Sequence, residues 1–231
     1  MGSVLITGSN RGLGLEWARQ FAQDQWRVFA TCRRPAEANA LQKLAEAHDA
    51  LTIHHLDIAV PEDIRAISWE LEGEPVDILL SNAGIYLEKG EAEFGSLCYH
   101  DWARTFEVNT TGTLRISECL IDNVAASDKR LIIAVSSHMG SIADIQHPGS
   151  YYYRSSKAAL NAAMQGLAAK LEPRGIGVLI LHPGGVRTRM GPRDGISPKE
   201  SVQGMRRLID QFDLKSHTGS FLRYDGAALP W

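Results

Sequence analysis

The architecture of this chain follows from one segment, Val4-Leu5-Ile6-Thr7-Gly8-Ser9-Asn10-Arg11-Gly12-Leu13-Gly14. Its three leading apolar residues predict a short buried strand. Residues 13–24 predict a helix, because Leu13, Trp17 and Phe21 fall on one helical face. The glycines between strand and helix allow a tight turn and close approach of backbone to a phosphate, and a helix start attracts anions. The segment therefore indicates a dinucleotide-binding unit, with a purely structural turn as the alternative.

The same alternation of strand and helix continues along the chain. Further strands are predicted at 27–32, 51–56, 76–80, 131–135 and 176–181, and further helices at 35–48, 61–72, 100–125 and 153–171. Such alternation predicts an α/β fold with a Rossmann-type, doubly wound parallel sheet and helices on both faces. Since no shift in composition marks a boundary, we expect a single domain over 1–231. A substrate loop is expected at about 184–198, where such sheets bind ligands; an ordinary solvated loop is the alternative.

Composition and net charge limit the partners and the cellular compartment that we expect for this chain. The chain has 231 residues, a net charge of -3 and scattered basic residues, so we expect no nucleic-acid partner. No apolar run reaches the length of a membrane span, so we expect no membrane partner. Cys32, Cys98 and Cys119 lie far apart in the sequence, which favours reduced thiols and a cytoplasmic protein.

Arginines follow the second predicted strand, at the place where dinucleotide-binding proteins meet the adenosine ribose. The segment reads Thr31-Cys32-Arg33-Arg34 and contains no acidic residue to bind a ribose 2′-hydroxyl. Because guanidinium groups bind phosphate well, this segment favours NADP(H) over NAD. Solvated surface arginines are the alternative interpretation.

A hydroxyl, a phenol and an ammonium are expected at the same sheet edge. Tyr153 and Lys157 are four residues apart at a predicted helix start, so they share a face, and Ser136-Ser137 ends the preceding strand. A phenol can donate the proton that carbonyl reduction needs, and a neighbouring ammonium lowers the phenol pKa. A serine hydroxyl can hold the substrate oxygen. A packed tyrosine with a solvated lysine is the alternative.

These residues resemble the short-chain dehydrogenase/reductase family over most of the chain, from Val4 to about Thr188. The matching motifs are T-G-x-x-x-G-x-G at Thr7–Gly14, N-A-G at Asn82–Gly84, Y-x-x-x-K at Tyr153–Lys157 and P-G-x-V-x-T at Pro183–Thr188. The segment around Ser137 and the ending Tyr224-Asp225-Gly226 … Leu229-Pro230-Trp231 are similar to the C-factor and sniffer-type carbonyl reductase branch.

The resemblance implies a role for each matching residue. It makes Tyr153 the general acid/base, Lys157 a ligand of the nicotinamide ribose, Ser137 the residue that orients substrate, and Asn109 the holder of a water in a proton relay. The expected cofactor-binding residues are Gly8, Ser9, Asn10, Arg11, Gly12, Leu13, Gly14, Arg33, Asp57, Ile58, Asn82, Ala83, Gly84, Tyr153, Lys157, Pro183, Gly184, Val186 and Thr188, and no metal is expected.

Two departures from the family pattern are present, and the second of them reshapes the wall of the substrate pocket. Ser81 stands where the family often has a first Asn before Asn-Ala-Gly, and the sixteen-residue gap from Ser137 to Tyr153 is longer than usual.

The leading hypothesis is an NADP(H)-dependent oxidoreductase acting on a small carbonyl or alcohol, as a homodimer or homotetramer. The alternatives are an NAD-dependent alcohol or hydroxysteroid dehydrogenase, and a C-factor-type signalling protein that binds cofactor with little turnover.

Overall fold

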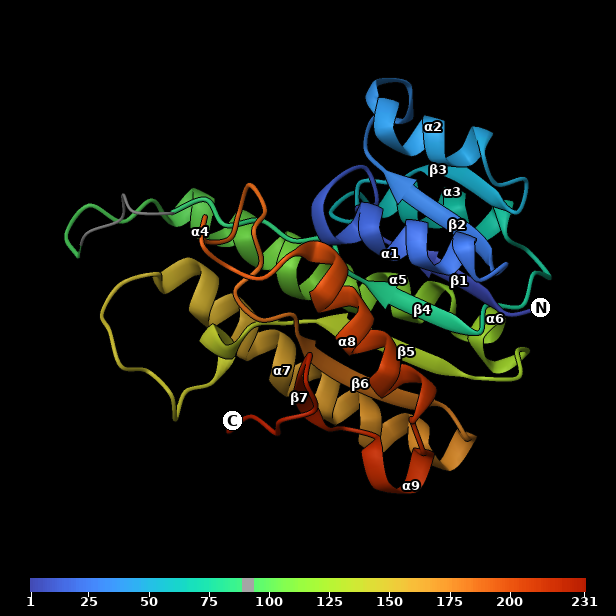
Figure 1. Ribbon diagram of the computed structural model, residues 1–231. Coiled ribbons are helices and arrows are strands. Elements are labelled where there is room, and N and C mark those ends of the chain that lie inside the picture. Colours follow the sequence, from blue (N-terminus) through green and yellow to red (C-terminus); the bar gives the residue numbers. More distant parts are fainter. Residues whose placement is uncertain (89–93) are drawn as a thin grey trace.

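A seven-stranded parallel sheet forms the centre of the computed structural model, which describes residues 1–88 and 94–231 (Figure 1). The strand order is β3-β2-β1-β4-β5-β6-β7. The strands are β1 (Ser3–Ile6), β2 (Arg27–Cys32), β3 (Leu51–His55), β4 (Ile78–Ser81), β5 (Leu131–Val135), β6 (Gly177–His182) and β7 (Phe221–Arg223). This arrangement confirms the predicted doubly wound α/β fold.

Helices cover both faces of this sheet. The helices are α1 (Gly12–Gln23), α2 (Asn39–Glu46), α3 (Pro61–Glu70), α4 (Tyr99–Phe106), α5 (Gly112–Cys119), α6 (Ile121–Ala125), α7 (Tyr151–Leu171), α8 (Pro198–Asp210) and α9 (Leu214–His217). One buried cluster joins the sheet to α1, α2 and α8, and the other joins it to α3, α5, α6 and α7. Successive residues of β1 alternate between them: Leu5 belongs to one cluster, and Val4 and Ile6 to the other.

The long helix predicted at 100–125 is not continuous. A π-helical turn, Glu107–Thr111, separates α4 from α5, and α6 follows a break after α5. At the start of α5, a side chain on Gly112 would place its Cβ 2.7 Å from the Ile58 carbonyl oxygen, so the helix lies directly against that backbone. The π turn carries Asn109, and π turns of this kind are frequent at functional sites.

Other element boundaries differ modestly from the predicted ones. The helix predicted at 35–48 is a short 3-10 turn followed by α2, and α7 begins at Tyr151, two residues before the predicted start. The sequence analysis assigned no element after 181, where α8, α9 and β7 lie. The last strand has only three residues and one of them is exposed, which leaves little apolar pattern to recognise.

All strands are parallel, so their carboxyl ends lie at one edge of the sheet (Figure 1). The loops that follow β1, β4, β5 and β6 emerge there, and the order of the strands reverses between β1 and β4. Ligands of open α/β sheets bind at such a switch point. This topology therefore gathers the glycine turn and the predicted catalytic residues at one edge.

Gly14 is the tightest point between the glycine turn and α1. A Cβ at this position would lie 2.1 Å from the Gly8 carbonyl oxygen and 2.8 Å from Asn82 Nδ2. We predict that Gly14→Ala lowers the free energy of unfolding by about 2–4 kcal/mol, measured by urea denaturation. Gly166→Ala in α7 is the matched control, because its Cβ would meet nothing within 4 Å, and it should be neutral or stabilising. Equal stability of the two variants would contradict this packing.

Candidate active site

The glycine turn has the backbone conformation that its sequence requires. Gly8 and Gly12 have φ angles of 72° and 56°, in the left-handed region that favours glycine. Arg11 stands at the N-cap of α1 with extended backbone and makes no side-chain cap. The first amides of α1 are therefore not capped by that side chain, which leaves a helix start suited to an anion.

Hydrogen bonds between β1 and β4 hold this turn in place. Thr7 Oγ1 accepts from the backbone N–H groups of Asn82 and Ala83, at 3.0 and 2.9 Å. The Asn82 side chain donates in return to the carbonyls of Thr7 and Gly8, at 2.9 and 3.3 Å. Asn82 and Ala83 thus brace the turn.

Residues of the glycine turn differ in whether their side chains are buried and hydrogen-bonded or exposed. Ser9 is buried, its hydroxyl donates to the Ile6 carbonyl, and its N–H donates to the Thr31 carbonyl at 2.8 Å. Asn10 and Arg11 are exposed. Ser9 therefore shapes the turn, whereas the side chains of Asn10 and Arg11 face outward.

The two arginines after β2 are both exposed but differ in their partners. Arg34 forms an ion pair with Glu37 at 3.2 Å. Arg33 has no ion pair with any described residue of the chain. Arg33 is therefore the more available cation at the end of β2.

Asp57 and Ile58 lie just beyond β3. The Asp57 carboxylate accepts from the N–H of Ala59 at 3.0 Å and pairs with Arg104 at 3.4 Å. The Ile58 side chain is buried in the core. Asp57 is thus fixed in position, and Ile58 can meet a ligand only through its backbone.

Ser137 and Tyr153 meet despite the long gap between them in the sequence. The Ser137 side chain lies close enough to the Tyr153 phenol to lower its pKa, and the Ser137 hydroxyl accepts from the N–H of Met139 at 3.1 Å. The neighbouring Ser136 instead donates to Asn161 at 2.6 Å, inside the protein. The structure therefore brings Ser137, and not Ser136, to the phenol.

Lys157 lies beside Tyr153 but points its ammonium at the sheet. Its Nζ donates to the Val135 carbonyl at 2.8 Å and lies 5.8 Å from the centre of the Tyr153 ring. Lys157 is only 4% exposed, and this burial lowers its pKa to about 8.

The expected lowering of the tyrosine pKa is absent from this geometry. Burial raises the pKa of Tyr153 to about 12, and this effect outweighs the hydrogen bond with Ser137, which lowers it. The nearby Tyr86 adds a smaller upward shift. Tyr153 therefore carries its proton at neutral pH, the form that a general acid needs.

Asn109 connects three parts of the site. Its Oδ1 accepts from the N–H of Ile85 at 2.8 Å, and its Nδ2 donates to the Ile85 carbonyl at 2.9 Å and to Ser156 Oγ at 3.0 Å. Gly84 lies alongside, since its Cβ would be 3.4 Å from Asn109 Oδ1 and 3.8 Å from Lys157 Nζ. Only Oδ1 keeps a lone pair that could accept from a further group.

The loop after β6 folds back on itself beside the glycine turn. Val186 pairs with Ile196 in a parallel bridge, and Thr188 Oγ1 accepts from the N–H of Gly191. The Thr188 methyl lies 3.6 Å from where a Gly12 Cβ would be. Before the bridge, Pro183 accepts from Ser201 of α8, and Gly184 has a φ angle of 81°. The motif of residues 183–188 thus faces the start of α1.

Sequence reasoning missed two residues that contact this cluster. Tyr86 stacks on Tyr153 with ring centres 4.5 Å apart, and Glu88 accepts hydrogen bonds from the start of α7. Both lie in the loop after β4, which has no helical or alternating pattern, and each contacts a helix more than sixty positions away. No spacing rule could have identified them.

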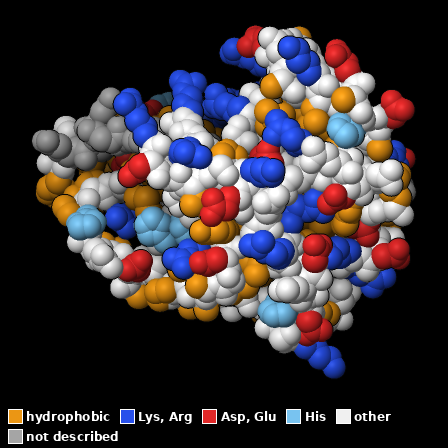
Figure 2. Space-filling model, viewed as in Figure 1, with side chains coloured by type: hydrophobic (Ala, Val, Ile, Leu, Met, Phe, Trp, Pro, Cys, Tyr) orange, Lys and Arg blue, Asp and Glu red, His pale blue; other side chains and the backbone are white. Residues whose placement is uncertain are grey.

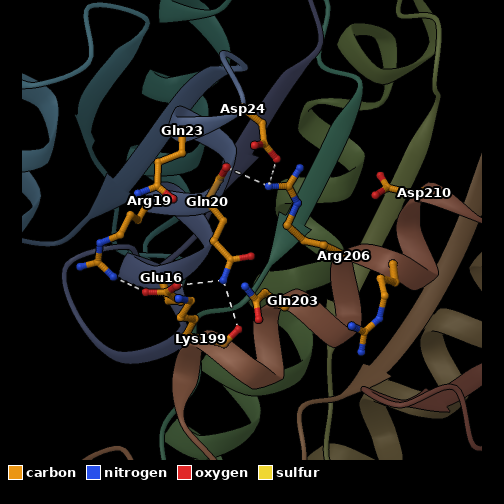
Figure 3. A pocket seen from close by; sticks show the side chains of 10 residues that line it. Glu16, Arg19, Gln20, Gln23, Asp24, Lys199, Gln203, Arg206 and Asp210 are labelled. Carbon is orange, nitrogen blue, oxygen red and sulfur yellow. Dashed lines mark hydrogen bonds and ion pairs between the residues drawn. The ribbon is translucent and has the colours of Figure 1, made fainter.

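A separate groove lies between α1 and α8 (Figure 3). The residues that line this groove bind one another. Gln20 donates to Glu16, and Arg206 donates to the Gln20 carbonyl and forms an ion pair with Asp24. Positive and negative side chains are interspersed on this face (Figure 2). None of the predicted site residues lines the groove.

Among the described residues, no group of three or more side chains is arranged to hold a metal ion. No helix in the described part of the chain is both long and apolar enough to cross a membrane.

Comparison with known proteins gives consistent matches. A family model described as short chain dehydrogenase matches residues 3–196. C-signal of Myxococcus xanthus is 38% identical over 169 residues, which cover 73% of this chain and 100% of that protein.

Two solved structures resemble the whole chain. The carbonyl reductase Sniffer of D. melanogaster superposes with a TM-score of 0.93 at 31% identity and covers 100% of both chains. An NADPH-bound carbonyl reductase from chicken fatty liver superposes with a TM-score of 0.90 at 31% identity, covering 99% of this chain and 98% of that one.

The buried Lys157 makes the free energy of unfolding depend on pH, and its lowered pKa determines the direction of that dependence. Its pKa falls from 10.5 to about 8 on folding, so between these values the unfolded chain binds more protons and wild-type stability rises with pH. We predict that Lys157→Met removes this rise. Its stability relative to wild type should drop by about 2 kcal/mol from pH 7 to pH 9.5, measured by urea denaturation.

The matched control is Lys170→Met, an exposed lysine of the same helix. Its stability relative to wild type should not vary with pH over this range. A Lys157→Met curve that runs parallel to wild type would show that Lys157 is not held at a lowered pKa.

Proposed function

This chain belongs to the short chain dehydrogenase family, and from that premise we propose that it is an NADP(H)-dependent oxidoreductase acting on a small carbonyl or alcohol. The family membership confirms the resemblance drawn from the sequence motifs. The observation that carries the proposal is the cluster of Ser137, Tyr153 and Lys157 beyond the carboxyl end of β5, at the same sheet edge as the glycine turn.

The residues present fit a dinucleotide. Gly12 adopts a left-handed conformation at the start of α1, and a Cβ there would reach only the Thr188 methyl, so the backbone is open to a phosphate. Arg33 is exposed at the end of β2 and suits a 2′-phosphate. The NADPH-bound reductase that superposes on this chain supports the same cofactor.

The chain's own groups supply the acid chemistry. When bound, NADPH supplies the hydride. Tyr153 donates its phenol proton to the substrate oxygen, and its pKa of about 12 keeps that proton in place at neutral pH. Ser137, whose side chain lies beside the Tyr153 phenol, holds the same oxygen. The ammonium of Lys157 stabilises the phenolate that remains, and the free lone pair of Asn109 Oδ1 can accept from a water on the route of the returning proton.

Two alternatives are distinguished by simple measurements. An NAD-dependent alcohol or hydroxysteroid dehydrogenase would show a lower Michaelis constant for NADH than for NADPH, and equal values would already contradict the preference for NADP(H). A signalling protein with little turnover is suggested by the similarity to C-signal. The protonated Tyr153 beside Lys157 favours catalysis over this second alternative, because a protein that only binds cofactor needs no acid.

We also propose a cytoplasmic location and a homodimer or homotetramer. The three cysteines are free thiols, which fits a reducing compartment. Trp69 and Tyr99 are large apolar side chains that are exposed in the single chain, so a second subunit could cover them.

Removal of the acid tests the mechanism. We predict that Tyr153→Phe lowers kcat for carbonyl reduction by at least about a hundredfold while the Kd for NADPH stays within twofold, measured by NADPH oxidation and by fluorescence titration. Tyr151→Phe is the matched control, since Tyr151 is a half-buried tyrosine two positions earlier in α7 and has the wrong offset to Lys157. Wild-type turnover by Tyr153→Phe would eliminate Tyr153 as the acid.

Removal of Arg33 tests the cofactor preference. We predict that Arg33→Ala raises the KM for NADPH roughly tenfold and leaves the KM for NADH unchanged, because only NADPH carries the 2′-phosphate. Arg65→Ala, an exposed arginine paired with Glu62 on α3, is the control. Equal shifts for both cofactors in Arg33→Ala would refute a contact with the 2′-phosphate.

A further inference from the structure

We propose that Glu88 is a positioning residue for Tyr153, acting as the carboxylate cap of the catalytic helix α7. The proposal rests on the proposed function, because it concerns the residue to which that function assigns the proton. Glu88 lies in the loop after β4, sixty-five positions from Tyr153, and belongs to none of the family motifs in the sequence.

The contacts of Glu88 are those of a helix cap. Its Oε1 accepts from the backbone N–H of Tyr153 at 2.6 Å, and its Oε2 accepts from that of Tyr152 at 2.9 Å. The residue is only 5% exposed. These two amides belong to the first turn of α7, where no carbonyl within the helix can accept from them. A carboxylate at this end also interacts favourably with the helix dipole.

The helix has no cap of its own. Ser150 occupies the N-cap position with a left-handed φ of 55°, and its side chain makes no capping hydrogen bond. Instead, its Oγ is hydrogen-bonded to the Tyr86 hydroxyl. The function that a serine usually serves at this position is therefore taken over by Glu88 from another part of the chain.

The same loop contacts the tyrosines at the start of α7 in other places. The Tyr86 ring stacks on Tyr153 with centres 4.5 Å apart and planes inclined by 24°. The N–H of Cys98 donates to the Tyr152 hydroxyl, and the Trp102 ring stacks on Tyr152. The chain on either side of residues 89–93 is thus attached to the helix start that carries the acid.

Glu88 therefore fixes both the backbone of Tyr153 and the loop beside it. Loss of the carboxylate leaves two buried amides without an acceptor, and the first turn of α7 would shift or fray to reach water. The phenol would move with that turn relative to Ser137 and to the substrate oxygen. The glycine turn lies on another element, and Lys157 lies one turn further along α7 with its ammonium bonded to the Val135 carbonyl, so cofactor binding should be largely preserved.

The kinetic test compares three variants. Glu88→Ala should lower kcat for carbonyl reduction by about ten- to a hundredfold with the KM for NADPH within twofold of wild type, because a small misplacement of a catalytic group is costly. Glu88→Gln keeps one acceptor oxygen and should recover part of this loss. The control is Glu62→Ala, which removes an exposed carboxylate from the first turn of α3 and should change neither constant.

Amide hydrogen exchange tests the cap without any turnover. In wild type and Glu62→Ala the amides of Tyr152 and Tyr153 should be protected, and in Glu88→Ala they should exchange at least about tenfold faster, with the thermal midpoint of the whole protein little changed. Unchanged protection in Glu88→Ala overturns the proposal. So does wild-type kcat in that variant, or a parallel loss of kcat, NADPH binding and thermal midpoint.

The two proposals fail in different ways. If wild type reduces no carbonyl compound, the proposed function fails, and amide hydrogen exchange alone then tests whether Glu88 caps α7. Faster exchange confined to Glu88→Ala supports the cap, and equal exchange in all variants overturns it. If wild type is active and Glu88→Ala is equally active, the role of Glu88 is refuted while the proposed function stands.

Discussion

The parallel pairing of β1 with β4, closed by the hydrogen bonds of Thr7 with Asn82 and Ala83, is the interaction on which the site depends. The pairing lies where the strand order reverses, so the glycine turn after β1 and the loops after β4 and β5 open toward the same edge. Asn82 also donates to the carbonyls of the turn, which keeps the start of α1 at a fixed distance from β4. Asn109 extends this bracing to the backbone of Ile85 and to Ser156 of α7.

Burial determines the protonation of the two central groups. It raises the pKa of Tyr153 to about 12 and lowers that of Lys157 to about 8, in both cases by disfavouring the charged form. A buried ammonium destabilises the fold below pH 8, so the site maintains Lys157 at a cost to stability. A charge held this way acts strongly on a phenolate that forms nearby, because little water screens it.

The parallel sheet with its alternating helices, and the proposed site residues that the structure brings to one sheet edge, could be predicted from the sequence because each rests on a local pattern. The glycine turn follows from three glycines between a strand and a helix, and Tyr153 and Lys157 follow from a four-residue spacing. Three features could not be predicted from sequence patterns. The π turn at Asn109 has no periodicity of its own, the last strand is only three residues long, and Glu88 reaches α7 through a contact distant in the sequence. The expected lowering of the Tyr153 pKa was wrong for this geometry, because burial raises that pKa and Lys157 turns its ammonium to the Val135 carbonyl.

The central claim is that this chain transfers a hydride from NADPH to a carbonyl carbon. Transfer of a deuterium label from the cofactor tests this claim most directly. Reduction by NADPH deuterated at the transferred position of C4 should be screened over aldehydes, ketones and ketosteroids, and the alcohol formed should be analysed by mass spectrometry and NMR. The account predicts one deuterium on the carbinol carbon when the solvent is H2O, and none there when unlabelled NADPH is used in D2O. Deuterium on that carbon from the solvent, or no labelled product from any of these substrates, would contradict it.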